Sequence, residues 1–525
     1  MKRSSMALLC VIALVATACG QKPRVHVPSG PARFAASEAT GATGDTGPLD
    51  ENGDLTSGDA STLAGAEGGS QGAGATTTTT RKGGGPVANA GGITPDKNDR
   101  AGVTADTIKI GFHAPLTGAA AVDLADLEHG NRVFSEWLKM EYGVTIFGRK
   151  TVILFENDEY KPSTAVNVCR KLVEEEGVFM LIGGAGTDQI QACARYAFGK
   201  KVPYISAGVT EKVVSKLPNY FAFSASYPDQ GPPLAKLIKT FDASAYGGGG
   251  GKVLIDRCNP SACAPDPGAP SAATSEPPKV AIVYSDTEGF HDARDDFVRA
   301  YGSGVLAIPI TKFNINGSDA NGVVQRLKQE GIDVVYILTS PTNFGNILNP
   351  AAVQRYFPRW VGIGLTMGIN LFAATSCGKP GFEHAIFLNP WFSVRHPLSD
   401  QWKAAWKKYG GPDQDARDKP EDHDIAFGLW GGSIIQHILL KAAGKDLTRS
   451  GFIAAAHKLQ AAVAPDDTKA GDIIDVYYPL TSKVGDNFGS AHSNILWADC
   501  GPSRRTGNYN YFNGPNAKPL TTADL

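Results

Sequence analysis

The chain has 525 residues and a formal net charge of −2, with 50 Lys and Arg residues against 52 Asp and Glu residues. This length is enough for more than one domain. The balanced charge lacks the clustered Lys and Arg residues typical of a nucleic-acid-binding surface, so we expect no nucleic-acid partner.

The N-terminus has the features of an export signal. Lys2 and Arg3 precede an apolar run from Met6 to Ala16. This run is shorter than the ~20 residues that a membrane-spanning helix needs. Small residues then lead into Cys19, and the sequence Ala16-Thr17-Ala18-Cys19-Gly20 resembles the lipobox of bacterial lipoproteins. We therefore expect a signal peptide at 1–18, a lipid on Cys19 and a location on the outer face of the cytoplasmic membrane. The alternative is an ordinary signal peptide with an uninvolved cysteine.

Residues 19–102 consist largely of Gly, Ala, Ser, Thr and Asp. Such a segment buries too little apolar surface to offset the entropy of ordering it, so we expect a disordered tether. A flexible chain of about 80 residues has a root-mean-square span of roughly 50 Å. The tether contains a GxSxG pattern at 68–72, but the nucleophile reading requires a preceding strand and a following helix. We attribute the pattern to composition.

Six cysteines remain once Cys10 leaves with the signal peptide and Cys19 is lipidated. An even number outside the cell favours disulfides over free thiols. The preferred pairs are Cys169 with Cys193, Cys258 with Cys263, and Cys377 with Cys500. Sequence alone leaves other pairings open. We expect no metal site and no cofactor, because neither a CxxC pair nor a His cluster accompanies these cysteines.

Apolar strand-like runs alternate with helical stretches from Val103 onward. The first series comprises Thr107 to Phe112, Val122 to Glu141, Thr151 to Phe155, Ser163 to Glu176, Val178 to Ile182, Asp188 to Phe198, and Val202 to Ser206. The second comprises Val280 to Tyr284, Ala293 to Tyr301, Val305 to Ile310, Asn321 to Gln329, Val334 to Leu338, and Phe344 to Tyr356. Helices dominate Leu398 to Leu459, and no stretch beyond the signal reaches membrane-spanning length. This alternation predicts two doubly wound α/β lobes.

Several motifs follow one another in a recognisable order: Val103 to Gly111, Pro115 to Gly118, Asp158 to Ala165, Ile182 to Gly184, Val202 to Ser206, and Asp333 to Tyr336. Their order and spacing resemble the leucine/isoleucine/valine-binding family of periplasmic binding proteins. The resemblance covers roughly residues 103–440. It implies two α/β lobes joined by a hinge, which close on a solute held in the cleft between them.

The expected lobe boundaries follow from this resemblance. Lobe 1 comprises 103–228 and 385–475, and lobe 2 comprises 229–384 and 476–525. The Gly-, Pro- and Ser-rich segment 246–278 is expected to form an insertion in lobe 2 that Cys258 and Cys263 hold together.

The resemblance also implies a set of ligand-binding residues. Thr187 matches the hydroxyl that binds the ligand carboxylate, at a helix start where free N–H groups favour an anion. Phe290 matches an aromatic residue of lobe 2 that covers the ligand. The full set is Thr117, Gly118, Thr187, Gly208, Thr210, Phe290, Ser340 and Thr366. The competing readings are helix capping for Thr187 and Thr210 and core packing for Phe290.

Departures from the family pattern affect the ligand's amino group. The family pairs this group with an acidic residue, but Thr366 stands at the matching position, and Ser340 or Pro341 replaces an aromatic residue. A buried ammonium without a carboxylate partner is costly. Asp123 is one substitute acid. We therefore expect the ligand to be an amino acid, an amide, a carboxylic acid, an aromatic compound or another small polar molecule.

We therefore expect a lipid-anchored, monomeric solute-binding protein that delivers a small molecule to an ABC permease. The alternative is a sensor on the same fold that binds without import. An enzyme is disfavoured, because the sequence contains neither an HExxH motif nor a phosphate-binding GxxxxGK[ST] loop.

Overall fold

The computed structural model describes most of the chain beyond the N-terminal segment. The described residues are 99–118, 120–143, 145–206, 214–222, 225–240, 278–310, 315, 317–363, 376–377, 379, 381–382, 385–389, 400–410, 423–460, 492–499, 508–511 and 520–521. The expected signal peptide, Cys19, most of the expected tether and residues 246–277 of the expected insertion 246–278 lie outside them.

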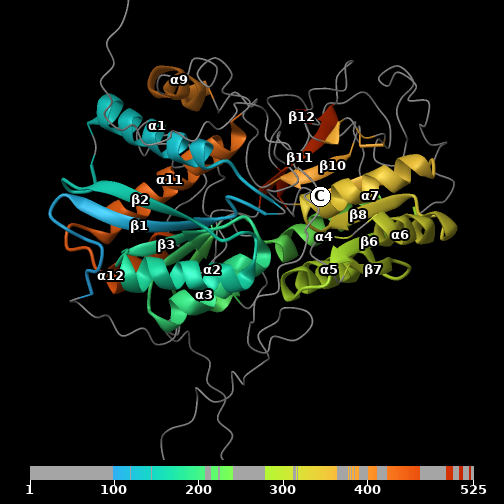
Figure 1. The fold of residues 1–525 in the computed structure, drawn as a ribbon, viewed down its shortest axis with the longest axis horizontal. Coiled ribbons are helices and arrows are strands. Elements are labelled where there is room, and N and C mark those ends of the chain that lie inside the picture. Colours follow the sequence, from blue (N-terminus) through green and yellow to red (C-terminus); the bar gives the residue numbers. More distant parts are fainter. Residues whose placement is uncertain are drawn as a thin grey trace, which may run out of the picture.

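Lobe 1 is built on a parallel sheet with the strand order β2-β1-β3-β4-β5. Its strands are β1 (Thr107–Ala114), β2 (Lys150–Asn157), β3 (Met180–Gly183), β4 (Tyr204–Ser206) and β5 (Tyr220–Ala222). Its helices are α1 (Leu124–Tyr142), α2 (Pro162–Arg170), α3 (Thr187–Gly199), α9 (Asp400–Tyr409), α11 (Asp424–Ala443) and α12 (Arg449–Gln460). Figure 1 shows α1, α9 and α11 on one face of this sheet and α2 and α3 on the other.

Lobe 2 is built on a larger, mixed sheet with the order β12-β11-β10-β9-β8-β6-β7, in which β13 also pairs with β11. Its strands are β6 (Val280–Ser285), β7 (Leu306–Ile310), β8 (Val334–Leu338), β9 (Arg359–Ile363), β10 (Ile386–Asn389), β11 (His492–Asp499), β12 (Asn508–Tyr511) and β13 (Leu520–Thr521). Its helices are α4 (Tyr227–Thr240), α5 (Glu288–Tyr301), α6 (Gly317–Gln329) and α7 (Pro341–Val353). The two lobes lie side by side in Figure 1.

Strand β6 lies between β8 and β7, and its place in the sheet explains why its sequence is a continuous apolar run. Val280 and Ile282 face the core that includes α4 and α5, whereas Ala281 and Val283 face the core that includes α6 and α7. A parallel strand covered by helices on both faces cannot alternate between apolar and polar residues. The doubly wound α/β fold expected from the sequence is therefore present in this lobe.

The elements that the sequence indicated differ from the observed ones mainly at their ends. The sequence pattern did not indicate helix α4 or the strands β5 and β9 to β13. β10 pairs with β9 and β11 of the second sheet, so the chain leaves lobe 2 after Asn389, a few residues beyond the expected boundary at 385. α5 begins at Glu288 rather than at Ala293, which places Phe290 in its first turn instead of in a preceding loop.

Helix α11 forms the centre of one face of lobe 1. Its segment Ile425–Ala443 is long and apolar enough to cross a membrane by length and composition, contrary to the sequence expectation, yet 72% of this window is buried inside the protein. Gly130 of α1 lies so close to Ala426 that a Cβ there would be 3.0 Å from its carbonyl oxygen. Trp137 and Trp430 pack beside this contact, with ring centroids 4.4 Å apart. The apolar character of α11 therefore serves the core.

Candidate ligand-binding site

The carboxyl ends of the parallel strands in lobe 1 bring the candidate loops together. The loop at 115–118 follows β1, the loop at 158–161 follows β2, and the loop at 184–186 follows β3. In doubly wound sheets this edge is where ligands bind. Gly208 and Thr210, expected after β4, lie outside the described residues, as does Thr366.

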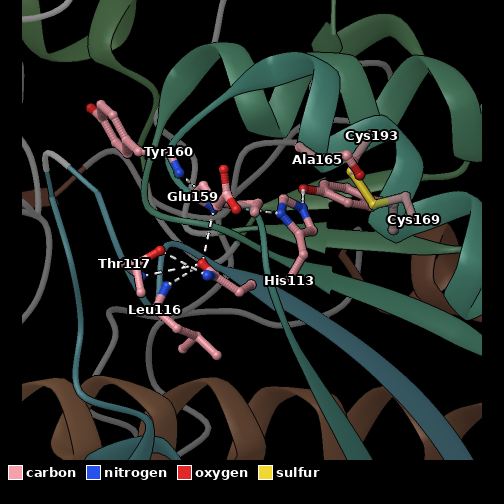
Figure 2. Close-up of polar contacts among 11 residues, drawn as sticks. His113, Leu116, Thr117, Glu159, Tyr160, Ala165, Cys169 and Cys193 are labelled. Atoms are coloured by element: carbon pink, nitrogen blue, oxygen red, sulfur yellow. Dashed lines mark hydrogen bonds and ion pairs between the residues drawn. A yellow bond between two sulfur atoms is a disulfide. The ribbon is translucent and has the colours of Figure 1, made fainter. Parts of the chain in front are cut away.

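Asn157, the last residue of β2, connects two of these loops. Its Oδ1 accepts hydrogen bonds from the backbone N–H groups of Leu116 (2.9 Å), Thr117 (3.2 Å) and Glu159 (2.9 Å). Its Nδ2 donates to the Thr117 hydroxyl at 2.8 Å. Among the described residues this hydroxyl only accepts, from Asn157, which leaves its own proton for donation to a ligand or to water. Figure 2 shows these contacts converging on one side chain.

Gly118 has a steric role in the same loop. Its φ is +101°, and a Cβ would lie 2.4 Å from the carbonyl oxygen of Glu159. A side chain at this position would therefore separate the two loops. Gly118 fits the expected site as a residue that allows close approach of the backbone.

A series of buried, hydrogen-bonded side chains holds the loop after β2 in place. His113 Nδ1 lies 2.8 Å from Asp158 Oδ2, and His113 Nε2 lies 2.7 Å from the Tyr204 hydroxyl. All three side chains are fully buried. Burial, with smaller effects from Tyr220 and Asp158, raises the pKa of Tyr204, so its hydroxyl stays protonated. The two ring nitrogens of His113 thereby connect the loop after β2 to strand β4.

The second oxygen of Asp158 fixes the backbone that follows it. Asp158 Oδ1 accepts from the N–H of Tyr160 at 2.9 Å. Glu159 and Tyr160 both adopt left-handed backbone angles, with φ of +54° and +60°. Non-glycine residues in this region are strained, and such strain persists where the surrounding structure imposes it. Asp158 and Asn157 supply the hydrogen bonds that impose it here.

Tyr160 is a candidate site residue that the sequence reasoning did not single out. Its ring lies against the start of α3, where a Cβ on Gly186 would be 2.8 Å from its Cε2. Burial raises the pKa of Tyr160, and the nearby Tyr227, Asp188 and Asp158 raise it further. The phenol therefore remains a hydrogen-bond donor at neutral pH. The sequence offered one signal for Tyr160, namely its position two residues before Pro162, the first residue of α2, in the loop that follows β2.

Thr187 is the first residue of α3, and its side chain is 5% exposed. The N-cap of α3 is Gly186, which supplies no side-chain hydrogen bond. The capping interpretation of Thr187 is therefore wrong, because the capping position belongs to a residue without a side chain. The first-turn N–H groups of α3 carry a partial positive charge that favours an anion.

Lobe 2 contributes an aromatic pair near this position. Phe290 is half-buried in the first turn of α5, and its ring stacks on Tyr227, with centroids 5.8 Å apart and an interplanar angle of 18°. Ser340 is the N-cap of α7 and accepts from the N–H of Asn343 at 3.2 Å. Asp123, the substitute acid, is exposed and caps α1 by accepting from Ala125 at 2.8 Å.

The two lobes meet where α3 faces α5. A Cβ on Gly289 would lie 1.9 Å from Cγ2 of Thr187 and 2.8 Å from Nε2 of Gln191. Arg195 Nη2 and Glu288 Oε2 form an ion pair at 3.1 Å at the exposed end of the same contact. The expected carboxylate-binding residue thus lies at the junction between the lobes.

The cysteines account for one further feature of lobe 1. Cys169 and Cys193 form a disulfide that joins α2 to α3, as the sequence led us to expect. Their sulfur atoms and His113 are the only described His, Cys, Asp or Glu group close enough to hold a metal. Both sulfurs are bonded to each other. Cys377 is also disulfide-bonded, while Cys258, Cys263 and Cys500 lie outside the described residues.

Two doubly wound lobes, with hydroxyl, aromatic and helix-start groups meeting at their junction, are the arrangement expected of a protein that binds a small solute between lobes. The family model for periplasmic binding proteins matches residues 107–472. The chain belongs to this family, and its fold is of the leucine-binding type.

Several solved structures have the same fold, and the alignment with this chain covers nearly all of each of them. A fatty acid ABC transporter substrate-binding protein from Thermomonospora curvata aligns with a TM-score of 0.59 and 16% identity, covering 82% of this chain and 96% of that one. A branched-chain amino acid ABC transporter protein from Thermus thermophilus with bound valine aligns with a TM-score of 0.56 and 15% identity, covering 79% and 97%. A solute-binding protein of an ABC transporter from Rhodopseudomonas palustris BisB5, in complex with 3,4-dihydroxybenzoic acid, aligns at 0.55 and 17%, also covering 79% and 97%. No curated protein matches the chain at a significant level.

Proposed function

We propose that this protein is a solute receptor of an ABC importer that captures a small carboxylate-bearing molecule between its lobes. Capture proceeds by hinge closure and involves no covalent chemistry. Amino acids and amides with a free carboxylate belong to this ligand class. The receptor then delivers the ligand to a membrane permease.

The placement of Thr187 supports this proposal most directly. Its hydroxyl lies at the uncapped start of α3, and its methyl group contacts Gly289 of lobe 2. An anion bound there would interact with the helix start and the hydroxyl at the same time. Closure of the lobes then removes water from that interaction, which strengthens it.

The relatives favour a carboxylate ligand. Valine and 3,4-dihydroxybenzoic acid, bound in two of them, both carry a carboxylate group, and the third relative is described as a fatty acid receptor. The half-buried Phe290 and the Tyr160 phenol suit the apolar and polar parts of such a ligand. Gly208, Thr210 and Thr366 complete the proposed site.

Anchoring forms the second part of the proposal. Residues 1–18 act as a signal peptide, a lipid on Cys19 holds the protein at the outer face of the membrane, and the Gly-rich tether lets the lobes reach the permease. The protein works as a monomer. Cys258 pairs with Cys263, and Cys377 pairs with Cys500.

A thermal-shift screen of the full-length chain against carboxylic acids, amino acids, amides and sugars tests the binding function. A ligand present at about 100 times its Kd should stabilise the fold by about 2.7 kcal/mol. Thr187→Val keeps the methyl contact but removes the hydroxyl, so it should weaken binding roughly 10-fold or more. Thr187→Ser, the matched control, should retain most of the affinity.

An uptake experiment distinguishes a role in transport from a role in sensing. Cells that carry the receptor and its permease should accumulate the radiolabelled ligand, and the Cys19→Ala variant should reduce this uptake. Binding without uptake in intact cells would favour the sensor alternative. A screen in which sugars bind and carboxylates do not would contradict the proposed ligand class.

A further inference from the structure

One face of α3 carries the contact with lobe 2. Thr187, Gln191 and Arg195 are spaced by four residues, which aligns them along a single side of a helix. Thr187 and Gln191 lie against Gly289, and Arg195 pairs with Glu288. This stripe runs from the proposed ligand position to the exposed rim of the interface.

The contact depends on the absence of a side chain at position 289. Gly289 is buried and lies in the first turn of α5, where the backbone comes directly against the Thr187 methyl group. A Cβ at this position would overlap Cγ2 of Thr187, because no two such carbons approach to 1.9 Å. The absence of a side chain at Gly289 therefore allows the backbone of α5 to contact Thr187 of α3 directly.

The side-chain amide of Gln191 lacks a hydrogen-bond partner for its Nε2, among the described residues, when the lobes are in contact. The residue is only 6% exposed. A buried amide donor without a partner loses the hydrogen bonds that water gives it, which is costly. Separation of the lobes exposes the amide to solvent and removes this cost.

The other polar contact of the stripe offsets this cost only weakly. In the Arg195–Glu288 pair, the side chains are 55% and 67% exposed. Exposed ion pairs contribute little, because water screens them and ordering two long side chains costs entropy. The balance of the polar groups along the stripe thus favours open lobes when no ligand is bound.

We propose that Gln191 sets the affinity of ligand capture by opposing closure, without itself touching the ligand. This inference rests on the proposed function, since it assumes that closure accompanies binding. Part of the free energy of ligand binding is used to desolvate the Gln191 amide. A receptor that closes only on an occupied cleft avoids a closed, empty state that would reach the permease unloaded.

Two substitutions at the same contact should act in opposite directions. Gln191→Leu keeps the approximate size but removes the buried amide, so it should raise the closed fraction and tighten binding between about 5-fold and 150-fold. Gly289→Ala should hold the lobes apart, lower the closed fraction and weaken binding. Both effects are measurable by isothermal titration calorimetry on the full chain with the ligand identified in the screen.

A ligand-free measurement separates this inference from the proposed function. Labels at Met140 and Val353, which are 63% and 82% exposed on different lobes, report the interlobe distance by fluorescence transfer. Gln191→Leu should shift the distance distribution toward the closed form without any ligand. Gln189→Leu is the control, because the Gln189 amide is also buried and unpartnered within the described residues but lies against Gly186 of its own lobe.

The outcomes are distinct. If no compound binds the unmodified chain, the proposed function fails, while the distance measurement still tests the role of Gln191. If Gln191→Leu binds the ligand more weakly, its amide contacts the ligand and the inference is wrong. An unchanged distance distribution in Gln191→Leu, or an equal shift in Gln189→Leu, also overturns it. Gln191→Met serves as the second variant if the Leu variant does not fold.

Discussion

The imidazole of His113 occupies the space that a side chain at Gly183 would need. The two residues pair in register on the neighbouring strands β1 and β3, and a Cβ on Gly183 would lie 1.8 Å from His113 Nε2 and 2.3 Å from the Tyr204 hydroxyl. The glycine after Ile182, one of the residues behind the family resemblance, is therefore required by a buried polar group. This relationship links a sequence motif to the support of the ligand loops.

Gly183→Ala should destabilise lobe 1 by about 2 kcal/mol or more, because the His113 ring must move and break one of its buried hydrogen bonds. Urea unfolding measures this change. Gly322→Ala is the control, since this glycine of α6 has open space around its Cβ position and negative φ. There the substitution should stabilise the protein by up to about 1 kcal/mol. Equal effects of the two variants would contradict the steric argument.

Asp158→Asn should cost about 3 kcal/mol of unfolding free energy, because it disrupts a buried pair on which both His113 and the Tyr160 backbone depend. It should also weaken ligand binding by releasing the strained loop at 159–160. The matched control is Asp286→Asn, which breaks a His–Asp pair of 2.7 Å whose side chains are 40% and 39% exposed. That pair should contribute less than about 1 kcal/mol. A similar loss in both variants would show that burial is not the deciding factor.

Arg449→Met should destabilise the protein by about 3 kcal/mol. Arg449 is 7% exposed, and its guanidinium donates to the carbonyl oxygens of Val178 (2.6 Å) and Phe179 (3.0 Å), the two residues before β3. The substitution keeps the aliphatic length but leaves two buried carbonyls without these donors. Thermal unfolding of Arg449→Met should be compared with that of Arg299→Met, whose side chain is 72% exposed. A loss no larger than in the Arg299 variant would refute the role assigned to Arg449.

His437 should make the protein less stable in acid. Burial, and secondarily Lys441, lowers the pKa of His437 from 6.5 to about 4. Between these two values the unfolded chain binds a proton that the folded chain does not, so unfolding becomes easier as the pH falls. The stability contribution is complete above pH 6.5 and decreases down to about pH 4, by about 3 kcal/mol.

The His437→Gln variant isolates this effect from the titration of carboxylates. The difference in unfolding free energy between the original chain and the variant should change between pH 6.5 and pH 4 and stay constant above pH 7. A difference that is independent of pH over this window would mean that the pKa of His437 is the same in the folded and the unfolded chain.

The sequence alone determined the alternating strands and helices from which the parallel part of each lobe is built. Strands such as Val334–Leu338 and helices such as α3 were predicted closely, because each depends on a local apolar pattern between turn or cap residues. The position of Thr187 at a helix start is local in the same sense. The sequence also indicated the pairing of Cys169 with Cys193, although it left other pairings open.

Only the tertiary structure decided how the site is held and how the lobes meet. Tyr160 became a candidate because Asn157 and Asp158 fix an unusual backbone, which no propensity predicts. Gln191 and Gly289 are far apart in the chain, and their contact arises from the packing of α3 against α5. The strands β9 and β10 also escaped prediction, since short strands are stabilised by their neighbours in the sheet more than by their own residues. Local patterns specify elements, whereas contacts between distant residues exist only once the lobes have folded.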